Sequence, residues 1–445
     1  MTRLCNLCNI ARSGARVVPP LIVAPMETAG KTPHGGVTVQ RDIMNKFSIL
    51  GLAVAATVLG LAVPALAEDV KLGILGDLTG PIESLAPPIV AGAQLAFDQV
   101  NAQGGILGGG KIVSVTGDSA CDPSVAGPAA DKLVNTDQVT AIVGAFCTGA
   151  TIGAATAAGI PGGVVQISPS ASAPALTTLE DNDLVFRTTP SDAFQGVKLA
   201  DLLTQKGIKD VAVTYVNNDY GKGLADVFVA QFTANGGTVS ANIAHEDGKA
   251  DYRAELGQLS SGGSQNLVIL AYASGSGKTV LQQAIEGGEF TAFVGGDGMI
   301  GDDLVVGLDP AAVNGKIIAT RAGAYTGASA DTYIKLATEA GQDPAATYAP
   351  QAYDAAFLLA LAIEKNASAK REGLSAALRE VASAPGEKIL PGEWTKAVEL
   401  IKAGTDIDYD GAGGPADFDK AGDVDGIIVE VSVQDGKFVE VGPVK

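Results

Sequence analysis

The run Val70-Lys-Leu-Gly-Ile-Leu75, followed by the stretch from Pro88 to Ala102, decides the fold class of this chain. The first segment is a short apolar run of the length expected for a buried strand. The second spaces its apolar side chains three and four residues apart, as on one face of a helix: Ile89, Ala93, Ala96, Phe97 and Val100. A strand followed by an amphipathic helix is the repeating part of a βαβ unit. The sequence therefore predicts an α/β fold.

The same alternation of short apolar runs and longer amphipathic stretches continues along the chain and restarts once. In the first set we expect further strands at 111–116, 140–143, 164–167 and 184–188, with helices at 123–135 and 149–158. In the second set we expect strands at 210–216, 238–244, 266–271, 293–294 and 316–320, with helices at 221–235, 252–260 and 278–287. Two such sets predict two α/β lobes of similar size.

Helical spacing returns beyond Arg321. Three helices are expected there, at 331–340, 351–365 and 371–384, followed by a Gly- and Asp-rich tract. A hairpin is predicted for 426–433 with 437–441. No long linker separates the two lobes.

The sequence is strongly acidic once its first 67 residues are set aside. Those residues hold 6 Lys+Arg and 2 Asp+Glu of the chain's 30 and 49, which leaves 24 and 47 and a net charge of −23. Such acidity disfavours nucleic acid and anionic membrane surfaces as partners. Two cysteines remain in this part, Cys121 and Cys147. They are either a disulfide, as an even pair in an oxidising compartment suggests, or two buried free thiols.

A secretory signal peptide is predicted at 44–67. A lysine is followed by an uncharged apolar run, and Ala65-Leu-Ala67 has the small residues of a cleavage site. A membrane anchor is the alternative, but the acidic pair Glu68-Asp69 follows where a basic flank would be needed. We therefore expect a mature chain that begins near Glu68 and lies in the periplasm without membrane insertion. Residues 1–43 are predicted to be a non-native upstream extension, including the motif Cys5-Asn-Leu-Cys8, which is expected to have no function.

Three loops of the first lobe begin at the carboxyl ends of predicted strands. They are Gly144-Ala-Phe-Cys147-Thr148-Gly149, Ser168-Pro-Ser170-Ala-Ser172 and Thr189-Pro190. Open α/β sheets bind their ligands at this edge. The first loop also runs into a helix, whose free N–H groups and the Thr148 hydroxyl favour an anionic group.

Taken with four further segments, these loops resemble the periplasmic leucine/isoleucine/valine-binding proteins, the substrate-binding subunits of ABC importers. The further segments are Leu75-Gly-Asp-Leu-Thr-Gly-Pro81, Asp118-Ser-Ala-Cys121-Asp-Pro123, Asn218-Asp-Tyr-Gly-Lys-Gly-Leu224 and Gly295-Gly-Asp-Gly298. The resemblance covers nearly all of 68–445, in order. It implies a type I periplasmic binding fold, with two doubly wound lobes joined by three crossovers near 189, 320 and 427. Lobe I would comprise 68–189 plus 321–427, and lobe II 190–320 plus 428–445.

The resemblance also implies a set of ligand-binding residues in the cleft between the lobes. Thr148 and the loop Ser170-Ala171-Ser172 would hold the carboxylate and amine of an amino acid. Asp297 would pair with the ammonium group, and Tyr220 would contact the ligand from the opposite lobe. Cys121 and Cys147 would form the family's disulfide, so that Cys147 braces the Thr148 loop.

Two positions depart from the family pattern. Leu85 stands where relatives often have an aromatic residue, and the tyrosine expected after the strand 266–271 falls at Ala273 or, with a shift, at Tyr272. The side-chain end of the pocket is therefore expected to differ. A branched-chain amino acid is the ligand that the resemblance implies, and another amino acid or a small carboxylate is the alternative.

The function expected from the resemblance is capture of a small amino acid by closure of the lobes, and its delivery to an ABC permease in the inner membrane. We expect a monomer that needs no cofactor and no metal. The alternative is a sensor that binds a small carboxylate and signals to a membrane receptor. From sequence alone, Thr148, Ser170 and Ser172 could instead be loop caps, Asp297 a turn residue and Tyr220 a packing residue.

Three other motifs were weighed and set aside. The segment Ser274-Gly-Ser-Gly277-Lys-Thr279 ends like a phosphate-binding loop but has Tyr272 in place of the first glycine. The segment from Asp406 to Asp417 has the acidic spacing of a calcium loop, but no helix pair is predicted beside it. His245 is the one histidine after the signal peptide, and no nucleophile motif accompanies it, so an enzyme is not expected.

Overall fold

The computed structural model describes residues 68–445. The predicted signal peptide and the upstream extension lie outside the described residues. Among 68–445, no helix combines the length and the apolar composition needed to cross a bilayer. The described part is a compact unit with an extensive core of its own.

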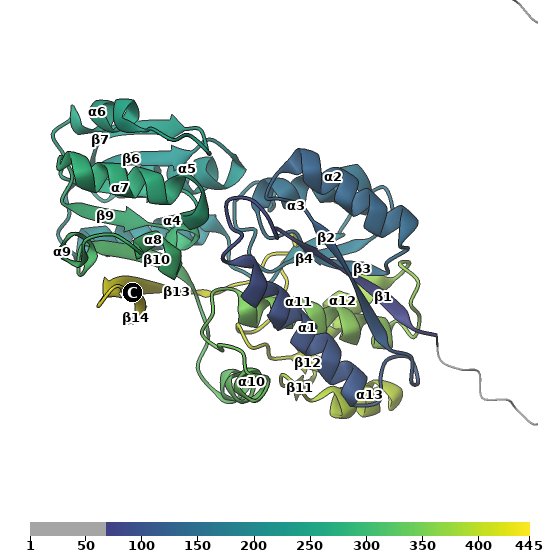
Figure 1. Ribbon diagram of the computed structural model, residues 1–445. Coiled ribbons are helices and arrows are strands. Elements are labelled where there is room, and N and C mark those ends of the chain that lie inside the picture. The colour runs from purple at the N-terminus through teal and green to yellow at the C-terminus, as the bar shows by residue number, and fades with distance from the viewer. Residues whose placement is uncertain (1–67) are drawn as a thin grey trace, which may run out of the picture. The chain divides into compact units, whose positions relative to one another are not determined.

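The sheet of lobe I has five parallel strands in the order β2-β1-β3-β4-β5 (Figure 1). These are β1 (Val70–Gly76), β2 (Ile112–Asp118), β3 (Ala141–Gly144), β4 (Val165–Ser168) and β5 (Val185–Arg187). The chain winds outward from β1 to β2 and then reverses to β3, so a topological switch point lies between β1 and β3. At this point Gly144 has a φ of 116°, and a side chain there would lie only 2.1 Å from the carbonyl oxygen of Leu75. Only glycine allows this close approach of the two strand ends.

Helices cover both faces of the lobe I sheet. On one face α2 (Pro123–Asp131) packs against α3 (Thr148–Ala154), and both continue as single wider turns, η1 (Lys132–Thr136) and η2 (Ala155–Gly159). On the other face α1 (Ala86–Ala102) lies beside α11 (Ala349–Lys365), which in turn packs against α12 (Leu374–Ala382) (Figure 1). Helix α11 is buried from Ala349 to Glu364, because it lies between the sheet and these neighbouring helices.

The sheet of lobe II has seven strands in the order β14-β13-β10-β9-β8-β6-β7. Its parallel part comprises β6 (Asp210–Val216), β7 (Thr238–His245), β8 (Asn266–Leu270), β9 (Ala292–Gly295) and β10 (Ile317–Gly323). The predicted hairpin, β13 (Ile427–Gln434) with β14 (Lys437–Pro443), adds antiparallel to β10. The second switch point lies between β6 and β8. Helices of this lobe are α5 (Asp219–Ala234), α6 (Arg253–Ser260) and α7 (Lys278–Gly287), with short turns η3 (Ala273–Gly277), η4 (Asp297–Met299), α8 (Asp302–Val305) and α9 (Pro310–Val313).

One long helix was absent from the sequence prediction, which gave no element between 188 and 210. Helix α4 (Asp192–Gln205) fills this gap and packs against α5. Its start is marked by Ser191, whose side chain accepts a hydrogen bond from the N–H of Ala193 at 3.2 Å. Its buried face includes Leu199, Leu202 and Leu203. Both signals were present in the sequence.

The tract after α12 is also more ordered than its composition suggested. It contains helix α13 (Trp394–Lys402) and a parallel pair of short strands, β11 (Glu387–Ile389) and β12 (Ile407–Tyr409). Trp394 is almost fully buried against Phe357 of α11, and its indole N–H donates to the carbonyl of Gly105 at 3.0 Å. One aromatic anchor therefore attaches this segment to the core of lobe I. Helix α10 (Ala328–Glu339) completes the described elements.

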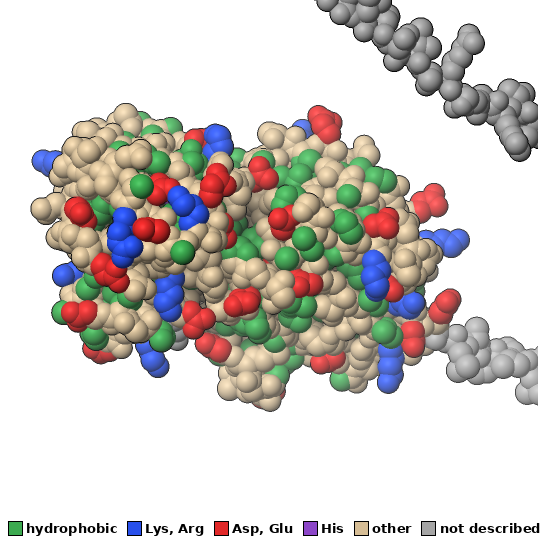
Figure 2. Space-filling view, turned by 45° about the horizontal axis from the view of Figure 1, so that its top comes forward, with side chains coloured by type: hydrophobic (Ala, Val, Ile, Leu, Met, Phe, Trp, Pro, Cys, Tyr) green, Lys and Arg blue, Asp and Glu red, His purple; other side chains and the backbone are tan. Residues whose placement is uncertain are grey.

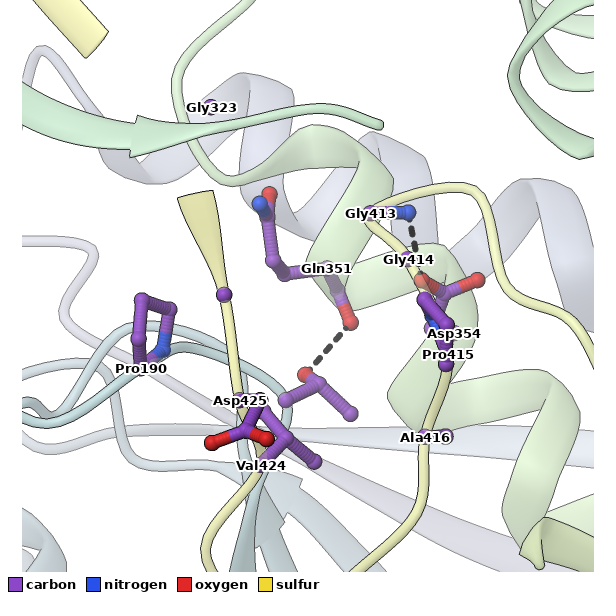
Figure 3. Close-up of a pocket in the computed structure, with 12 residues that line it drawn as sticks. Pro190, Gly323, Gln351, Asp354, Gly413, Gly414, Pro415, Ala416, Val424 and Asp425 are labelled. Atoms are coloured by element: carbon purple, nitrogen blue, oxygen red, sulfur yellow. Dashed lines mark hydrogen bonds between the residues drawn. The ribbon is translucent and has the colours of Figure 1, made fainter. Parts of the chain in front are cut away.

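The chain passes between the two sheets three times, after β5, after β10 and before β13. The protein thus has two doubly wound lobes joined by three crossovers, as the resemblance implied. Residues of all three crossovers, Pro190, Gly323 and Asp425, line one small pocket together with Gln351 and Asp354 of α11 (Figure 3). The Thr188 hydroxyl donates to the carbonyl of Gln351 at 2.8 Å. The crossovers therefore meet on α11, at the place where a hinge between the lobes would lie.

Candidate ligand-binding cleft

A cavity with an empty space of about 360 Å³, part of it open to solvent, lies between the strand ends of the two sheets. Lobe I contributes residues that follow β1, β3 and β4 or that begin α1 and α11, and lobe II contributes residues that follow β6, β8 and β9. The lining residues are Ile82, Leu85, Ile89, Phe146, Cys147, Thr148, Ser170, Tyr220, Tyr272, Asp297, Gly298 and Tyr348. The cavity therefore lies at both switch points, where open α/β sheets bind ligands.

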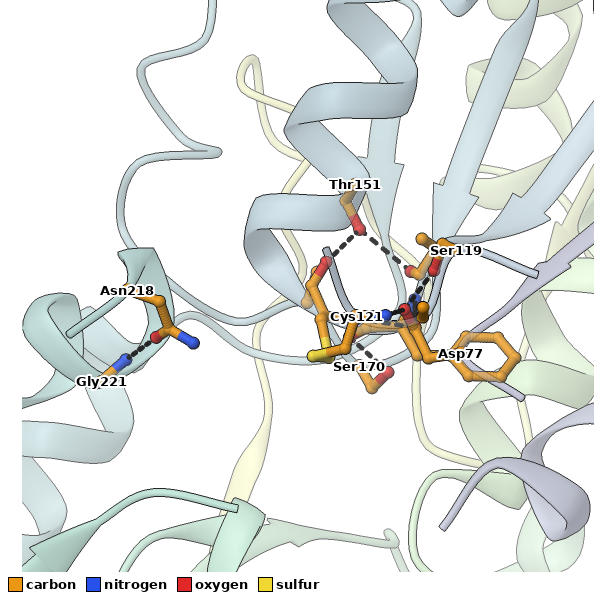
Figure 4. The surroundings of a disulfide bond; sticks show 12 residues. Asp77, Ser119, Cys121, Thr151, Ser170, Asn218 and Gly221 are labelled. Carbon is orange, nitrogen blue, oxygen red and sulfur yellow. Dashed lines mark hydrogen bonds between the residues drawn. A yellow bond between two sulfur atoms is a disulfide. The ribbon is translucent and has the colours of Figure 1, made fainter. Parts of the chain in front are cut away.

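A disulfide braces one wall of this cavity (Figure 4). Cys121, which follows β2, is joined to Cys147, which precedes α3. Buried Asp77, at the end of β1, accepts hydrogen bonds from the N–H groups of Cys121 and Phe146, both at 2.7 Å, and from that of Cys147 at 3.1 Å. Burial raises the pKa of the Asp77 carboxyl group, although these donors oppose the shift. The loop before Thr148 is thus fixed to β1 and β2 at once.

The residues predicted to hold a carboxylate divide into two groups. Thr148 and Ser170 line the cavity, and the Ser170 hydroxyl donates to the carbonyl of Phe146 at 2.9 Å. Ala171 and Ser172 do not line it. Ala171 lies in a small apolar cluster behind α3, and the Ser172 hydroxyl donates to Asp192 at 3.0 Å. The two cavity residues stand beside the first turn of α3, whose first N–H groups have no partner within the helix.

Asp297, which follows β9, is buried in the floor of the cavity and accepts three side-chain hydrogen bonds. Its Oδ1 accepts from the Tyr220 hydroxyl and from Nε2 of Gln195, both at 2.9 Å. Its Oδ2 accepts from the Tyr348 hydroxyl at 2.6 Å. Burial raises the pKa of Asp297, and the three donors counter this by favouring the ionised form.

A second carboxyl group, Asp192 at the start of α4, lies close enough to Asp297 for their charges to interact. Burial and the Asp297 charge raise the pKa of Asp192 well above its ordinary value. Asp192 receives a side-chain hydrogen bond only from Ser172, whereas Asp297 receives three. Of the two, Asp297 is therefore the carboxyl group whose ionised form has more hydrogen-bond donors to stabilise it, and it lines the cavity.

Two stacked tyrosines form the lobe II wall. Tyr220 lies in the first turn of α5, which Asn218 caps by accepting from the N–H of Gly221 at 2.9 Å (Figure 4). Its ring stacks on Tyr272 with 5.0 Å between centroids. Of the two positions considered for this tyrosine, 272 lines the cavity, while Ala273 begins η3. Gly298 lets the Tyr220 hydroxyl approach, because a side chain there would lie 2.9 Å from that oxygen.

The sequence reasoning missed five lining residues: Ile82, Ile89, Phe146, Gly298 and Tyr348. The first two join Leu85 in an apolar wall of the cavity. Ile89 was predicted only as a residue of the core face of α1. The helical spacing of apolar residues gives the same signal for a core residue as for one that lines a cleft. Tyr348 precedes α11 with a φ of 64°, a left-handed conformation that is uncommon for a bulky residue. No sequence pattern signals that its side chain crosses the cleft.

The motifs that were set aside have structural partners. In the segment resembling a phosphate loop, the N–H of Ser276 donates to the carboxylate of Asp247 at 2.5 Å, so an acidic group occupies the anion position. Buried His245 bonds to the Thr214 hydroxyl at 2.7 Å and to that of Ser276 at 3.0 Å. Burial lowers the pKa of this histidine to about 4.

The acidic residues of the calcium-like segment contact different neighbours. Asp406 pairs with Lys365 at 3.5 Å and Asp410 with Lys388 at 3.4 Å. Strand β12 runs through this segment. On the face shown in Figure 2, basic and acidic side chains are interspersed, and no continuous basic surface is visible.

Comparisons with known proteins agree with this architecture. The family model described as "Periplasmic binding protein" matches residues 69–437. The leucine-, isoleucine-, valine-, threonine- and alanine-binding protein of Pseudomonas aeruginosa is 31% identical over 331 residues, 74% of this chain and 87% of that protein. A leucine-binding protein of Thermotoga maritima superposes with a TM-score of 0.71 at 24% identity, covering 84% of this chain and 99% of that one.

A third similar protein is the branched-chain amino acid transporter substrate-binding protein of Streptococcus pneumoniae, solved in complex with isoleucine. It has a TM-score of 0.68 at 24% identity and covers 84% of this chain and 100% of its own. Because the family model matches most of the chain, the protein belongs to the periplasmic binding protein family, a family of solute-binding proteins.

Proposed function

We propose that the protein captures a branched-chain amino acid, with leucine, isoleucine and valine as the substrates, and delivers it to an ABC permease. The observation that carries this proposal is Asp297, a buried carboxyl group that lines the cavity and accepts hydrogen bonds that favour its ionised form. A buried charge needs a charged partner or several donors, and an α-ammonium group supplies both. The names of the similar proteins, which bind leucine, isoleucine or valine, support the same ligand class.

The other ends of the ligand would meet matching surfaces. The α-carboxylate would lie against Thr148 and Ser170 at the start of α3, where N–H groups and hydroxyls favour an anion. The branched side chain would pack against the apolar wall of Ile82, Leu85 and Ile89. These three contacts place ammonium, carboxylate and side chain on three sides of one cavity.

The charge of the cavity favours an amino acid over a carboxylate without an amine. None of its lining residues is Lys, Arg or His, and one of them is the acidic residue Asp297. A plain carboxylate would leave the Asp297 charge without a counter-ion beside a second negative group. The same argument disfavours the alternative of a sensor for small carboxylates.

The mechanism is a shift of population between open and closed lobes. Asp297 and Tyr220 belong to lobe II, whereas Thr148 and Leu85 belong to lobe I, so a ligand contacts both sets only when the lobes meet. The ligand therefore binds the closed form more tightly than the open form, and this difference in affinity shifts the population toward the closed form. The closed form would be the one that the permease recognises, and no chemical change of the ligand is proposed.

Processing and assembly complete the proposal. We infer that 44–67 acts as a signal peptide, that the mature chain begins near Glu68 and that it works as a monomer. Lobe I is assigned 68–189 plus 321–427, and lobe II 190–320 plus 428–445. The alternation of sheets along the chain supports this division, except that the last three residues of β10 and the first residue of β13 belong to the lobe II sheet.

The test is calorimetric titration of the protein after unfolding and refolding to remove any bound solute. L-Leucine, L-isoleucine and L-valine are expected to bind. Isocaproate, which lacks the amine of leucine, and isoamylamine, which lacks the carboxylate, are expected to bind at least tenfold more weakly, since each leaves one charge-assisted contact unmade. Binding of isocaproate as tight as that of leucine would refute the amino-acid assignment.

A further inference from the structure

Two direct hydrogen bonds join the lobes across the cleft at sites away from the hinge. At the rim, the hydroxyl groups of Ser84 and Ser274 lie 2.6 Å apart. At the bottom of the cleft, the Tyr348 hydroxyl donates to Asp297 at 2.6 Å, a bond that we call the depth bond. Ser84 precedes α1 and Tyr348 precedes α11, both in lobe I, whereas Ser274 and Asp297 follow β8 and β9 in lobe II. The bond between Ser172 and Asp192 also crosses, but it lies close to the first crossover.

Both partners of the rim bond are held in place by their own lobe. Ser84 lies in a turn in which the N–H of Glu83 donates to the carbonyl of Gly80 at 3.2 Å and that of Leu85 to Ile82 at 2.9 Å. Ser274 lies in η3, where Ser276 is bonded to Asp247 and to His245. Because neither hydroxyl belongs to a free loop, little conformational entropy is lost when the two meet.

The surfaces around the rim bond fit closely. A side chain at Gly275, next to Ser274, would place its Cβ 2.7 Å from the Cβ of Pro81 in lobe I. Real Cβ atoms do not approach so closely, so glycine is needed for this contact between the lobes. The two lobes therefore pack closely against each other at the rim, and a hydrogen bond joins them there.

The depth bond is fixed in a different way. Tyr348 holds a φ of 64° and a ψ of 0°, a sparsely populated conformation for a tyrosine. Such outliers persist where surrounding structure enforces them, and they cluster at functional positions. Here the conformation directs the hydroxyl out of lobe I to the carboxylate of lobe II, where burial strengthens the bond.

We propose that Ser84–Ser274 and Tyr348–Asp297 form a latch that closes the lobes without a ligand, so that part of the ligand-free protein is closed and the latch sets ligand affinity. Neither bond includes the ligand. The apparent dissociation constant is the intrinsic constant divided by the closed fraction, so loss of the Ser84–Ser274 bond weakens binding without loss of any ligand contact. Ser84 and Ser274 are positioning residues, because neither lines the ligand cavity.

The test measures the distance between the lobes without ligand. Spin labels are attached by a chemistry that does not use cysteine at exposed Val125 on α2 and Lys222 on α5, and the distance distribution is recorded by pulsed EPR. The wild type is expected to show a short, closed distance beside a longer, open one. Ser84→Ala should lower the ratio of closed to open molecules about fivefold, the effect of one ordinary hydrogen bond.

Matched controls separate the latch from general stability. Ser114→Ala removes a bond of the same kind, from the Ser114 hydroxyl to Gln94 at 2.8 Å, within lobe I. Tyr353→Phe removes the bond from Tyr353 to Gln99 at 2.5 Å, also within lobe I, and matches Tyr348→Phe. Both controls should leave the distance distribution of the wild type unchanged, whereas Ser84→Ala and Tyr348→Phe should shift it toward the open distance.

Ligand affinity gives the second readout. The dissociation constant of leucine should rise in Ser84→Ala by up to about fivefold, the limit reached when the closed form is the minor one. The latch is refuted if the ligand-free wild type shows only the open distance, or if Ser84→Ala gives the same distribution as the wild type. The distance measurement needs no ligand. Its result therefore tests the latch whether or not the proposed function, binding of an amino acid, is correct.

Discussion

Replacement of Asp297 by asparagine removes one negative charge from the floor of the cavity and little else. The new side chain can still accept from Tyr220 and Gln195 at its oxygen. The Tyr348 hydroxyl can rotate to accept from its amide. The carboxylate of the wild type is buried, with a raised pKa, so the loss of its charge also removes a desolvation cost. We therefore expect Asp297→Asn to fold with unchanged or slightly higher thermal stability.

Leucine binding should fall sharply in the same variant. A hydrogen bond between charged groups contributes about 2–3 kcal/mol where a buried ammonium would otherwise lose its counter-ion. At 1.36 kcal/mol per factor of ten, the dissociation constant of leucine should rise roughly 30- to 160-fold. Isocaproate has no ammonium group, so its affinity should stay the same or improve. The preference for leucine over isocaproate should therefore shrink by a similar factor.

The assay is calorimetric titration of both ligands into the wild type, Asp297→Asn and Asp192→Asn. The last variant is the matched control, because Asp192 is an equally buried acid beside Asp297 that does not line the cavity. Its leucine affinity should change less than threefold, since Asp192 does not line the cavity and burial disfavours its charged form. Equal leucine affinity in Asp297→Asn and the wild type would remove Asp297 from the ammonium site and, with it, the charge argument for an amino acid.

Three further predictions concern the frame of the cleft. Cys121→Ser with Cys147→Ser opens a loop whose ends are 26 residues apart, which should lower the free energy of unfolding by about 3.5 kcal/mol in urea titration; a loss below 1 kcal/mol would show that the bridge does not restrain the unfolded chain. Leu85→Ala should raise the dissociation constant of leucine about tenfold and leave that of alanine unchanged, because it deletes only apolar contact; an equal loss for both ligands would place Leu85 outside the side-chain wall. The pKa of His245 is lowered from 6.5 to about 4 in the folded protein. As the pH falls, His245 is therefore protonated in the unfolded chain before it is protonated in the folded one, and acid favours unfolding. As pH falls from about 6.5 to about 4, the wild type should lose up to about 3 kcal/mol of stability relative to His245→Gln in pH-dependent denaturation, and parallel curves would contradict this.

The strands were predictable because buried parallel strands leave short apolar runs of Val and Ile between turn residues. The sequence range 210–216 coincides with β6, and helix 278–287 coincides with α7. Helix α4 was not predicted, although Ser191 caps it and Leu199, Leu202 and Leu203 have helical spacing. Helix α13 was missed because glycines and aspartates around it dominate the local composition.

The cleft was predictable in part for a different reason. Residues that follow strands, such as Thr148 and Asp297, converge because the carboxyl ends of parallel strands meet at one edge. Ser172 follows the same strand as Ser170 but turns toward Asp192, since two residues along a loop can face opposite ways. Tyr348 could not be placed, because its position depends on a left-handed backbone conformation and on the contact between lobes, neither of which leaves a periodic signal.

The central claim is that one cavity holds the ammonium, carboxylate and side chain of a branched-chain amino acid between two lobes. A crystal structure of the protein with L-leucine tests it most directly. The account predicts leucine nitrogen within about 3.2 Å of an Asp297 oxygen, its carboxylate against Thr148 and Ser170, and its side chain on Leu85. Leucine bound outside this cavity, or in it with its carboxylate toward Asp297, would contradict the account.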